Sequence, residues 1–176
     1  MPWILQVATG RRVLAAAATA LVGTGLLFGT GPFPAVQSLA PAGVLPEEQL
    51  GYGADELHAF LGAIGPDGRA AYVLFQRLDI LTPLLLGGAA MFLIAWLLRR
   101  GGTRAGPGAW LSFVPVLFLP TEVAEDFVLG RAARLYPAES SLSAALPVLT
   151  GAKFAVMALM AVVIAGCALR LAWRKD

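Results

Sequence analysis

Residues 80–98 read ILTPLLLGGAAMFLIAWLL, a stretch without a single charged side chain. At about 1.5 Å per residue, a helix of this length spans roughly 28 Å, close to the hydrocarbon thickness of a bilayer, about 30 Å. Asp79 precedes the stretch, and Arg99 and Arg100 follow it. Because the bilayer core offers backbone N–H and C=O groups no other partner, the stretch is predicted to be a transmembrane helix.

The composition of the whole chain agrees with this reading. Of its 176 residues, 58% are hydrophobic and 14% are charged, whereas soluble domains have about 45–50% apolar and about 25% charged residues. The net charge of +2 is too small to indicate nucleic-acid binding, and one cysteine with one histidine argues against a Cys/His metal site. No phosphate-binding glycine loop or metal-ligand motif occurs, so neither a cofactor nor a metal is expected.

Three further apolar segments accompany the first, so the predicted fold is all-α: a polytopic membrane protein with a four-transmembrane-helix bundle. The whole chain, residues 1–176, forms a single membrane domain in this prediction. A connection over residues 32–69 follows the first span, and Ala54–Ile64 within it has the apolar spacing of a short amphipathic helix. Gly65–Gly68 is predicted to be a turn. The four spans are expected at about 12–31, 70–98, 109–129 and 146–169.

Basic residues set the orientation of the spans. Cytoplasmic loops of membrane proteins carry an excess of Lys and Arg. Both termini and the connection between the second and third spans are therefore predicted to be cytoplasmic, and residues 32–69 form an outer loop. The basic residues on the cytoplasmic side are Arg11, Arg12, Arg99, Arg100, Arg104, Arg170, Arg174 and Lys175. The opposite side holds Arg69, Arg131 and Arg134 with Glu47, Glu48, Asp55, Glu56, Asp67 and Glu139.

Charged side chains also interrupt three of the spans at one depth. Measured from the cytoplasmic ends, Asp79 lies at about 28 Å, Glu122 at about 20 Å and Lys153 at about 24 Å. Charges inside a membrane are costly and usually face the bundle interior. These groups are therefore predicted to form an acidic ligand-binding pocket near the outer leaflet. Its predicted residues are Asp79, Glu122, Glu125, Asp126, Tyr72, Gln76 and Lys153.

The spacing of these residues supports a shared pocket. Glu122, Glu125 and Asp126 are three and four residues apart, so they lie on one stripe of a helix. Tyr72, Gln76 and Asp79 similarly line one face of the preceding span. The same pattern also suits a structural polar network that fixes helix register, or a site that handles ions or protons. No catalytic residue is assigned.

Part of the chain resembles a known group of sequences. Phe60-Leu61-Gly62, Gly68-Arg69-Ala70-Ala71-Tyr72 and Asp79-Ile80-Leu81-Thr82-Pro83 resemble segments of bacterial four-helix membrane proteins whose activity is uncharacterised. In that group an acidic "D..EN" follows on the third helix, where this chain has Glu122, Glu125 and Asp126. The resemblance covers about residues 52–130, implies a multi-pass protein of the cell inner membrane, and implies no activity.

A looser, architectural resemblance is to the emopamil-binding (EXPERA) membrane proteins, which include sterol isomerases and proteins that bind lipids or cationic drugs. Those isomerases are expected to use a histidine inside the membrane. The only histidine of this chain, His58, falls in the outer loop, which argues against isomerase chemistry.

Three functions remain open at this point. The first is binding of a lipid or a small cationic or amphipathic ligand in the acidic pocket. The second is an accessory subunit of a larger membrane complex, such as an energy-transducing or photosynthetic assembly. The third is ion or proton transport, although one four-helix chain without an inverted repeat leaves little room for an alternating-access path. The expected partners are membrane lipids and other membrane-protein subunits.

Overall fold

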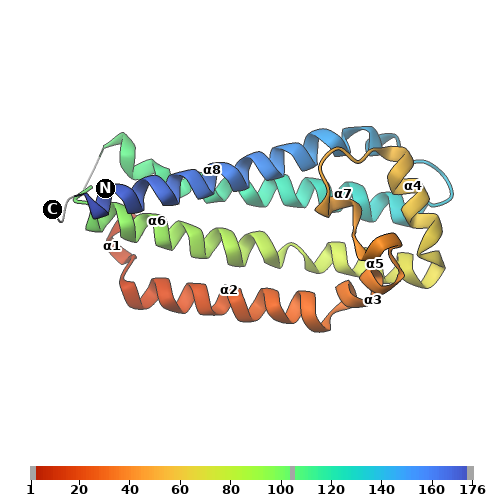
Figure 1. The fold of residues 1–176 in the computed structure, drawn as a ribbon, viewed down its shortest axis with the longest axis horizontal. Coiled ribbons are helices and arrows are strands. Elements are labelled where there is room, and N and C mark those ends of the chain that lie inside the picture. The colour runs from red at the N-terminus through yellow and green to blue at the C-terminus, as the bar shows by residue number, and fades with distance from the viewer. Residues whose placement is uncertain (1–2, 104–105, 174–176) are drawn as a thin grey trace. The chain divides into compact units, whose positions relative to one another are not determined.

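A computed structural model describes residues 3–103 and 106–173, and within these residues every regular element is a helix (Figure 1). Arg104, Arg174 and Lys175, which contributed to the predicted orientation, lie outside the described residues. The all-α prediction is confirmed. The α-helices are α1 (Trp3–Val7), α2 (Gly10–Thr30), α3 (Pro32–Leu39), α4 (Ala54–Ala63), α5 (Gly65–Leu78), α6 (Gly88–Arg100), α7 (Phe118–Leu135) and α8 (Leu146–Ala172). Short 3-10 helices are η1 (Pro41–Gly43), η2 (Pro46–Glu48), η4 (Pro107–Leu117) and η5 (Ser141–Ala145), and η3 (Pro83–Gly87) is a π-helix.

Three helical segments are long and apolar enough to cross a membrane: Gly10–Thr30, Gly65–Arg100 and Ser141–Ala172. They correspond to the first, second and fourth predicted spans. The third predicted span, residues 109–129, is divided between η4 and α7, and it is not among the membrane-length apolar helices of the described residues. Pro115 lies inside η4, and α7 carries the charged residues Glu122, Glu125, Asp126, Arg131 and Arg134.

The connection after α2 is mostly helical. The predicted amphipathic helix is confirmed as α4, which buries Leu57, Phe60 and Leu61. The predicted turn at residues 65–68 is wrong, because α5 already begins at Gly65. Gly65 has a φ of 67°, a value that favours glycine, and Pro66 follows in the first turn, where its missing N–H costs nothing.

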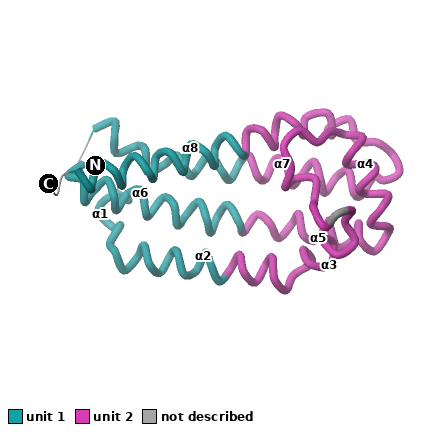
Figure 2. Tube along the Cα trace, viewed as in Figure 1, with its two compact units in different colours: residues 1–22, 82–120, 154–176 teal, residues 23–81, 121–153 magenta. Residues whose placement is uncertain are grey.

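The chain forms two compact units (Figure 2). The first comprises residues 1–22, 82–120 and 154–176. Its core joins α1, α6 and η4, with Ile4, Leu5, Ile94 and Ala109 fully buried, and the free thiol Cys167 packs among them. Gly87 allows a close approach here, because a Cβ atom at this position would lie 3.2 Å from the Pro115 carbonyl oxygen.

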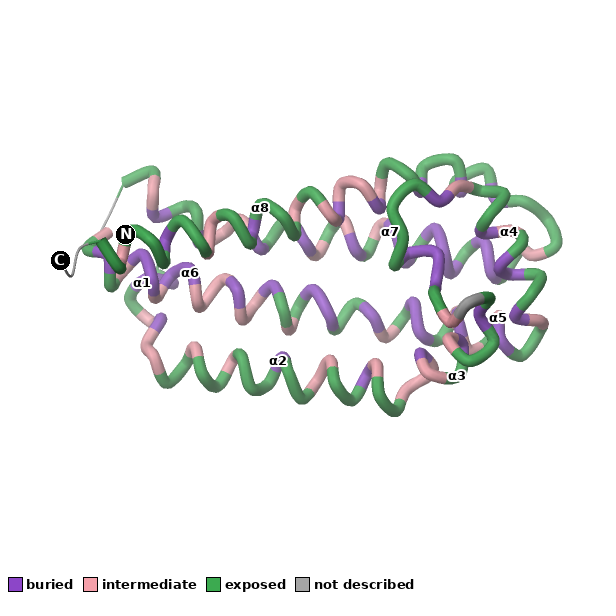
Figure 3. The backbone as a smooth tube through the Cα atoms, in the orientation of Figure 1, coloured by how far each residue is buried: buried purple, intermediate pink, exposed green. Residues whose placement is uncertain are grey.

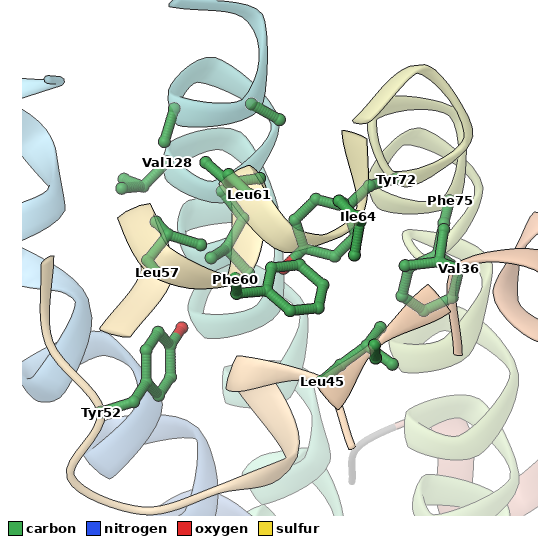
Figure 4. Close-up of a cluster of buried hydrophobic side chains, with 14 of the residues drawn as sticks. Val36, Leu45, Tyr52, Leu57, Phe60, Leu61, Ile64, Tyr72, Phe75 and Val128 are labelled. Carbon is green, nitrogen blue, oxygen red and sulfur yellow. The ribbon is translucent and has the colours of Figure 1, made fainter. Parts of the chain in front are cut away.

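The second unit comprises residues 23–81 and 121–153, and it contains every predicted pocket residue. Its core packs α3, α4, α5 and α7 around large side chains (Figure 4). The ring of Phe75 lies 5.1 Å from that of Phe33 and 5.9 Å from that of Phe28. Leu45, from the loop between η1 and η2, is fully buried in the same cluster. This core fixes the loop against α5.

Helix α2, like α8, buries few of its side chains (Figure 3). Of its described side chains, only Ala20 and Leu27 are buried, whereas Leu14 is 72% exposed and Leu21 is 74% exposed. A Cβ atom added at Gly25 or Gly29 would meet no described atom within 4 Å. Most side chains of α2 are therefore exposed or half-buried among the described residues.

Candidate functional site

Helix α7 presents three carboxylates to the interior of the second unit. Glu122, Glu125 and Asp126 are 5%, 0% and 8% exposed, because their three- and four-residue spacing places them on one helical face. Asp79 directly follows the end of α5 and is also buried. Thus α5 and α7 together contribute four carboxyl groups to one interior region.

A fifth carboxyl group comes from the loop. Pro46 starts the short helix η2, and the Leu45 backbone N–H donates a 2.7 Å hydrogen bond to Glu48 Oε2. The Glu48 side chain therefore folds back onto the first residue of the turn and is exposed. Leu45 is buried in the apolar core and anchors the turn there. Glu47, between them, is directed inward and is only 8% exposed.

Two side chains of α5 bind the Glu47 carboxylate. The Tyr72 hydroxyl donates to Glu47 Oε2 at 2.6 Å, and Gln76 Nε2 donates to Glu47 Oε1 at 2.7 Å. Burial nevertheless dominates and raises the pKa of Glu47 to about 7, with the Tyr72 and Gln76 hydrogen bonds and the charge of Lys153 opposing the shift. Glu47 therefore titrates near neutral pH.

Lys153 of α8 is the central cation of the site. Its Nζ lies 2.5 Å from Glu125 Oε2 and 4.0 Å from Glu122 Oε2, and it donates to the Glu47 carbonyl oxygen at 3.2 Å. Glu125 Oε1 also accepts hydrogen bonds from the Tyr52 hydroxyl at 3.2 Å and from the Thr150 hydroxyl. Burial, followed by the charge of Glu125, raises the pKa of Tyr52, so this phenol remains a donor.

The remaining carboxylates form a compact group, which we call the acidic trio: Asp79, Glu122 and Asp126. One oxygen from each of the three lies within 4.8 Å of the other two. Asp126 Oδ2 and Glu122 Oε2 are buried and accept no hydrogen bond from the described part of the chain. Buried acceptors in native proteins nearly always have a hydrogen-bond donor or a cation beside them, so we expect a proton or a cation at these two oxygens.

The charges of the site do not balance. Among the described residues, the buried charged side chains are five carboxyl groups and one ammonium group. Removing an unpaired carboxylate from water costs several kcal/mol even after relaxation of the protein. Lys153 lies closest to Glu125, so the site keeps an excess of buried carboxyl groups over buried ammonium groups among the described residues. The five carboxyl groups are Glu47, Asp79, Glu122, Glu125 and Asp126, and the ammonium group is that of Lys153.

A cavity of about 210 Å³ adjoins this region of the second unit. Gln76 and Asp126 line it together with Arg77 and Arg134, whose side chains are exposed. The rest of the wall is largely apolar, and Phe127 on this wall is 57% exposed. The cavity therefore combines an apolar entrance, two basic groups and a buried carboxylate.

All seven predicted pocket residues lie in this one region. Asp79, Glu122 and Asp126 form the acidic trio, and Lys153 pairs with Glu125. Tyr72 and Gln76 bind Glu47 rather than the carboxylates of α7. Their role in binding a ligand stays a prediction.

Three residues of the network were not anticipated from the sequence: Glu47, Tyr52 and Thr150. Thr150 precedes Lys153 by three residues on α8, so helical spacing is the signal that would have predicted their common face. The sequence places Glu47 among the charged residues of the outer loop. A three-residue helix has no periodicity that distinguishes an inward carboxylate from an exposed one. Tyr52 gave no signal of this kind either.

The chain matches no family model, no curated protein and no solved structure. The resemblances noted from the sequence therefore remain predictions, and the site is interpreted from its own geometry.

The first prediction concerns Lys153. Lys153→Met should lower the free energy of unfolding by about 3–5 kcal/mol, because it leaves Glu125 charged and buried without a partner. Adding Glu125→Gln should recover much of this loss, since the amide is neutral and still accepts from Tyr52 and Thr150. Unfolding in mixed detergent micelles measures both effects. Arg131→Met, at an exposed position of the same unit, is the control and should change little. Equal destabilisation by the single and double variants would contradict the pairing.

The second prediction concerns pH. Glu47 has a pKa of about 7 when folded, against 4.5 as the usual value, so the folded state binds more protons between these two pH values. Its contribution to stability is therefore present below about pH 4.5 and is lost as pH rises through about 7, by up to about 3 kcal/mol.

Glu47→Gln should accordingly reduce the fall in unfolding free energy between pH 4.5 and pH 7, measured in neutral detergent. Glu139→Gln, at an exposed position of the same unit, should keep the slope of the parent protein. An unchanged slope in Glu47→Gln would show that other groups cause the pH dependence.

Proposed function

We propose that this chain is a multi-pass protein of the bacterial inner membrane with four helical spans and both termini in the cytoplasm. Three membrane-length apolar helices support this proposal, and α7 with η4 supplies the fourth span. Arg11, Arg12, Arg99, Arg100 and Arg170 all lie at helix ends that the proposal places on the cytoplasmic side.

Within that setting, we propose that the acidic site binds a lipid or small amphipathic ligand through a positively charged group. The observation that carries this function is the excess of five buried carboxyl groups over one ammonium group. Charges in membrane segments commonly mark ligand or ion sites. Asp126 lines the cavity, so a ligand in the cavity can reach one of the buried carboxyl groups. Arg77 and Arg134 on the same wall suit the phosphate of a zwitterionic head group.

The accessory-subunit function is supported by a separate observation. Gly25 and Gly29 leave a surface of α2 open to close approach by another helix, as small residues do at helix interfaces in membranes. Purification from native membranes in mild detergent separates the two functions: a stoichiometric partner protein favours the subunit, and retained lipid on a lone chain favours ligand binding.

Ligand binding is tested with dodecyltrimethylammonium, an amphipathic cation with a small head group, added to the purified protein in neutral maltoside micelles. Saturable binding is expected, and Asp126→Asn should weaken it roughly tenfold, the equivalent of about 1.4 kcal/mol for one lost charge interaction. Equilibrium binding of the radiolabelled amphiphile gives the affinity.

Asp67→Asn is the matched control, because Asp67 is an exposed carboxylate of the same unit. It should bind the amphiphile like the parent protein. Equal affinity in Asp126→Asn and the parent protein would reject the acidic site as the binding site.

A further inference from the structure

The acidic trio has a geometry that is more specific than an excess of negative charge. Its three carboxylate oxygens lie within 4.8 Å of one another, and Asp79, Glu122 and Asp126 are all at least nine-tenths buried. Ca²⁺ binds oxygen at about 2.3–2.6 Å, so two oxygens on opposite sides of the ion are about 5 Å apart. A point between the three oxygens therefore lies within about 2.8 Å of each, so a shift of a few tenths of an ångström brings all three to the Ca–O distance.

A fourth oxygen supports the same conclusion independently of the carboxylates. Gln76 is 4% exposed, and its Oε1 accepts no hydrogen bond within the described residues. Because Nε2 must face the acceptor Glu47, the orientation of the amide is fixed and Oε1 is directed away from Glu47. Gln76 and Asp126 line the same cavity, and each keeps a buried oxygen without a hydrogen-bond partner among the described residues.

The nearest ammonium group does not fill this role. Lys153 Nζ lies 4.0 Å from Glu122 Oε2, and it is engaged more closely by Glu125 at 2.5 Å and by the Glu47 carbonyl at 3.2 Å. Arg77 and Arg134 are exposed on the cavity wall. Glu122 and Asp126 each keep a buried carboxylate oxygen that accepts no hydrogen bond within the described residues.

We propose that Asp79, Glu122 and Asp126, with the amide oxygen of Gln76, bind one hard divalent cation. Ligands that are all oxygen select Ca²⁺, Mg²⁺ or Mn²⁺ over softer metals. The cavity of about 210 Å³ has room for several water molecules, which complete a coordination sphere of six to eight oxygens. This inference rests on the proposed function, because it assigns a second positively charged ligand to the same carboxylates.

Mn²⁺ is the probe, because the electron paramagnetic resonance signal of the free aqueous ion disappears when the ion is bound. Full-length protein, treated with chelator in neutral maltoside micelles, is titrated with Mn²⁺ and then with competing Ca²⁺. We expect one Mn²⁺ per chain, displaced by Ca²⁺. Glu122→Gln and Asp126→Asn should each weaken Mn²⁺ binding at least tenfold, and Asp67→Asn should not change it.

Gln76→Met separates coordination from electrostatics, because it removes an oxygen ligand without changing a charge. It should weaken Mn²⁺ binding several-fold more than Tyr72→Phe, which removes the other hydrogen-bond donor to Glu47 but no proposed metal ligand. Equal loss of Mn²⁺ affinity in the two variants would mean that Gln76 acts through the Glu47 network, and the four-oxygen site would be wrong.

The parent protein decides the proposal even if a variant fails to fold. Absence of a single Mn²⁺ site in the parent, with dodecyltrimethylammonium still bound at the acidic site, overturns the metal site and keeps the proposed function. Absence of binding by both probes overturns both proposals.

Discussion

The ammonium group of Lys153 connects parts of the second unit that are distant in sequence. It pairs with Glu125 of α7 and binds the main-chain carbonyl of Glu47, so one side chain of α8 links α7 to the loop after α3. Inside a low-dielectric interior such a contact is strong, but it is stabilising only while both charges are present. This contact adds to the apolar anchoring of the loop by Leu45.

The rest of the polar interior follows from how that one cation is shared. Glu125 receives Lys153, Tyr52 and Thr150, and Glu47 receives Tyr72 and Gln76. Asp126 and Glu122 each keep a buried oxygen that no hydrogen-bond donor of the described chain satisfies. Lys153 and two hydroxyl groups thus surround Glu125, whereas Glu122 and Asp126 of the acidic trio have fewer partners, and Asp126 lines the cavity.

The sequence predicts those features that depend on regular spacing. Long apolar runs indicate α2, the α5–α6 segment and α8, and the spacing of Glu122, Glu125 and Asp126 indicates their common face. Features set by tertiary contacts are missed: Glu47 is buried because Leu45 anchors its turn, and neither residue belongs to a periodic pattern. The close approach of Asp79 to Glu122 and Asp126 likewise depends on tertiary packing, because these residues come from two segments of the chain and match no motif.

Helix α2 stands apart from this dependence on particular partners. Only Ala20 and Leu27 are buried among its described side chains, so most of its positions are exposed or half-buried. Selection for the fold then acts on the overall hydrophobicity of α2 rather than on individual residues. Substitutions that exchange one aliphatic side chain for another should accumulate there freely, whereas the interior faces of α5 and α7 tolerate few replacements.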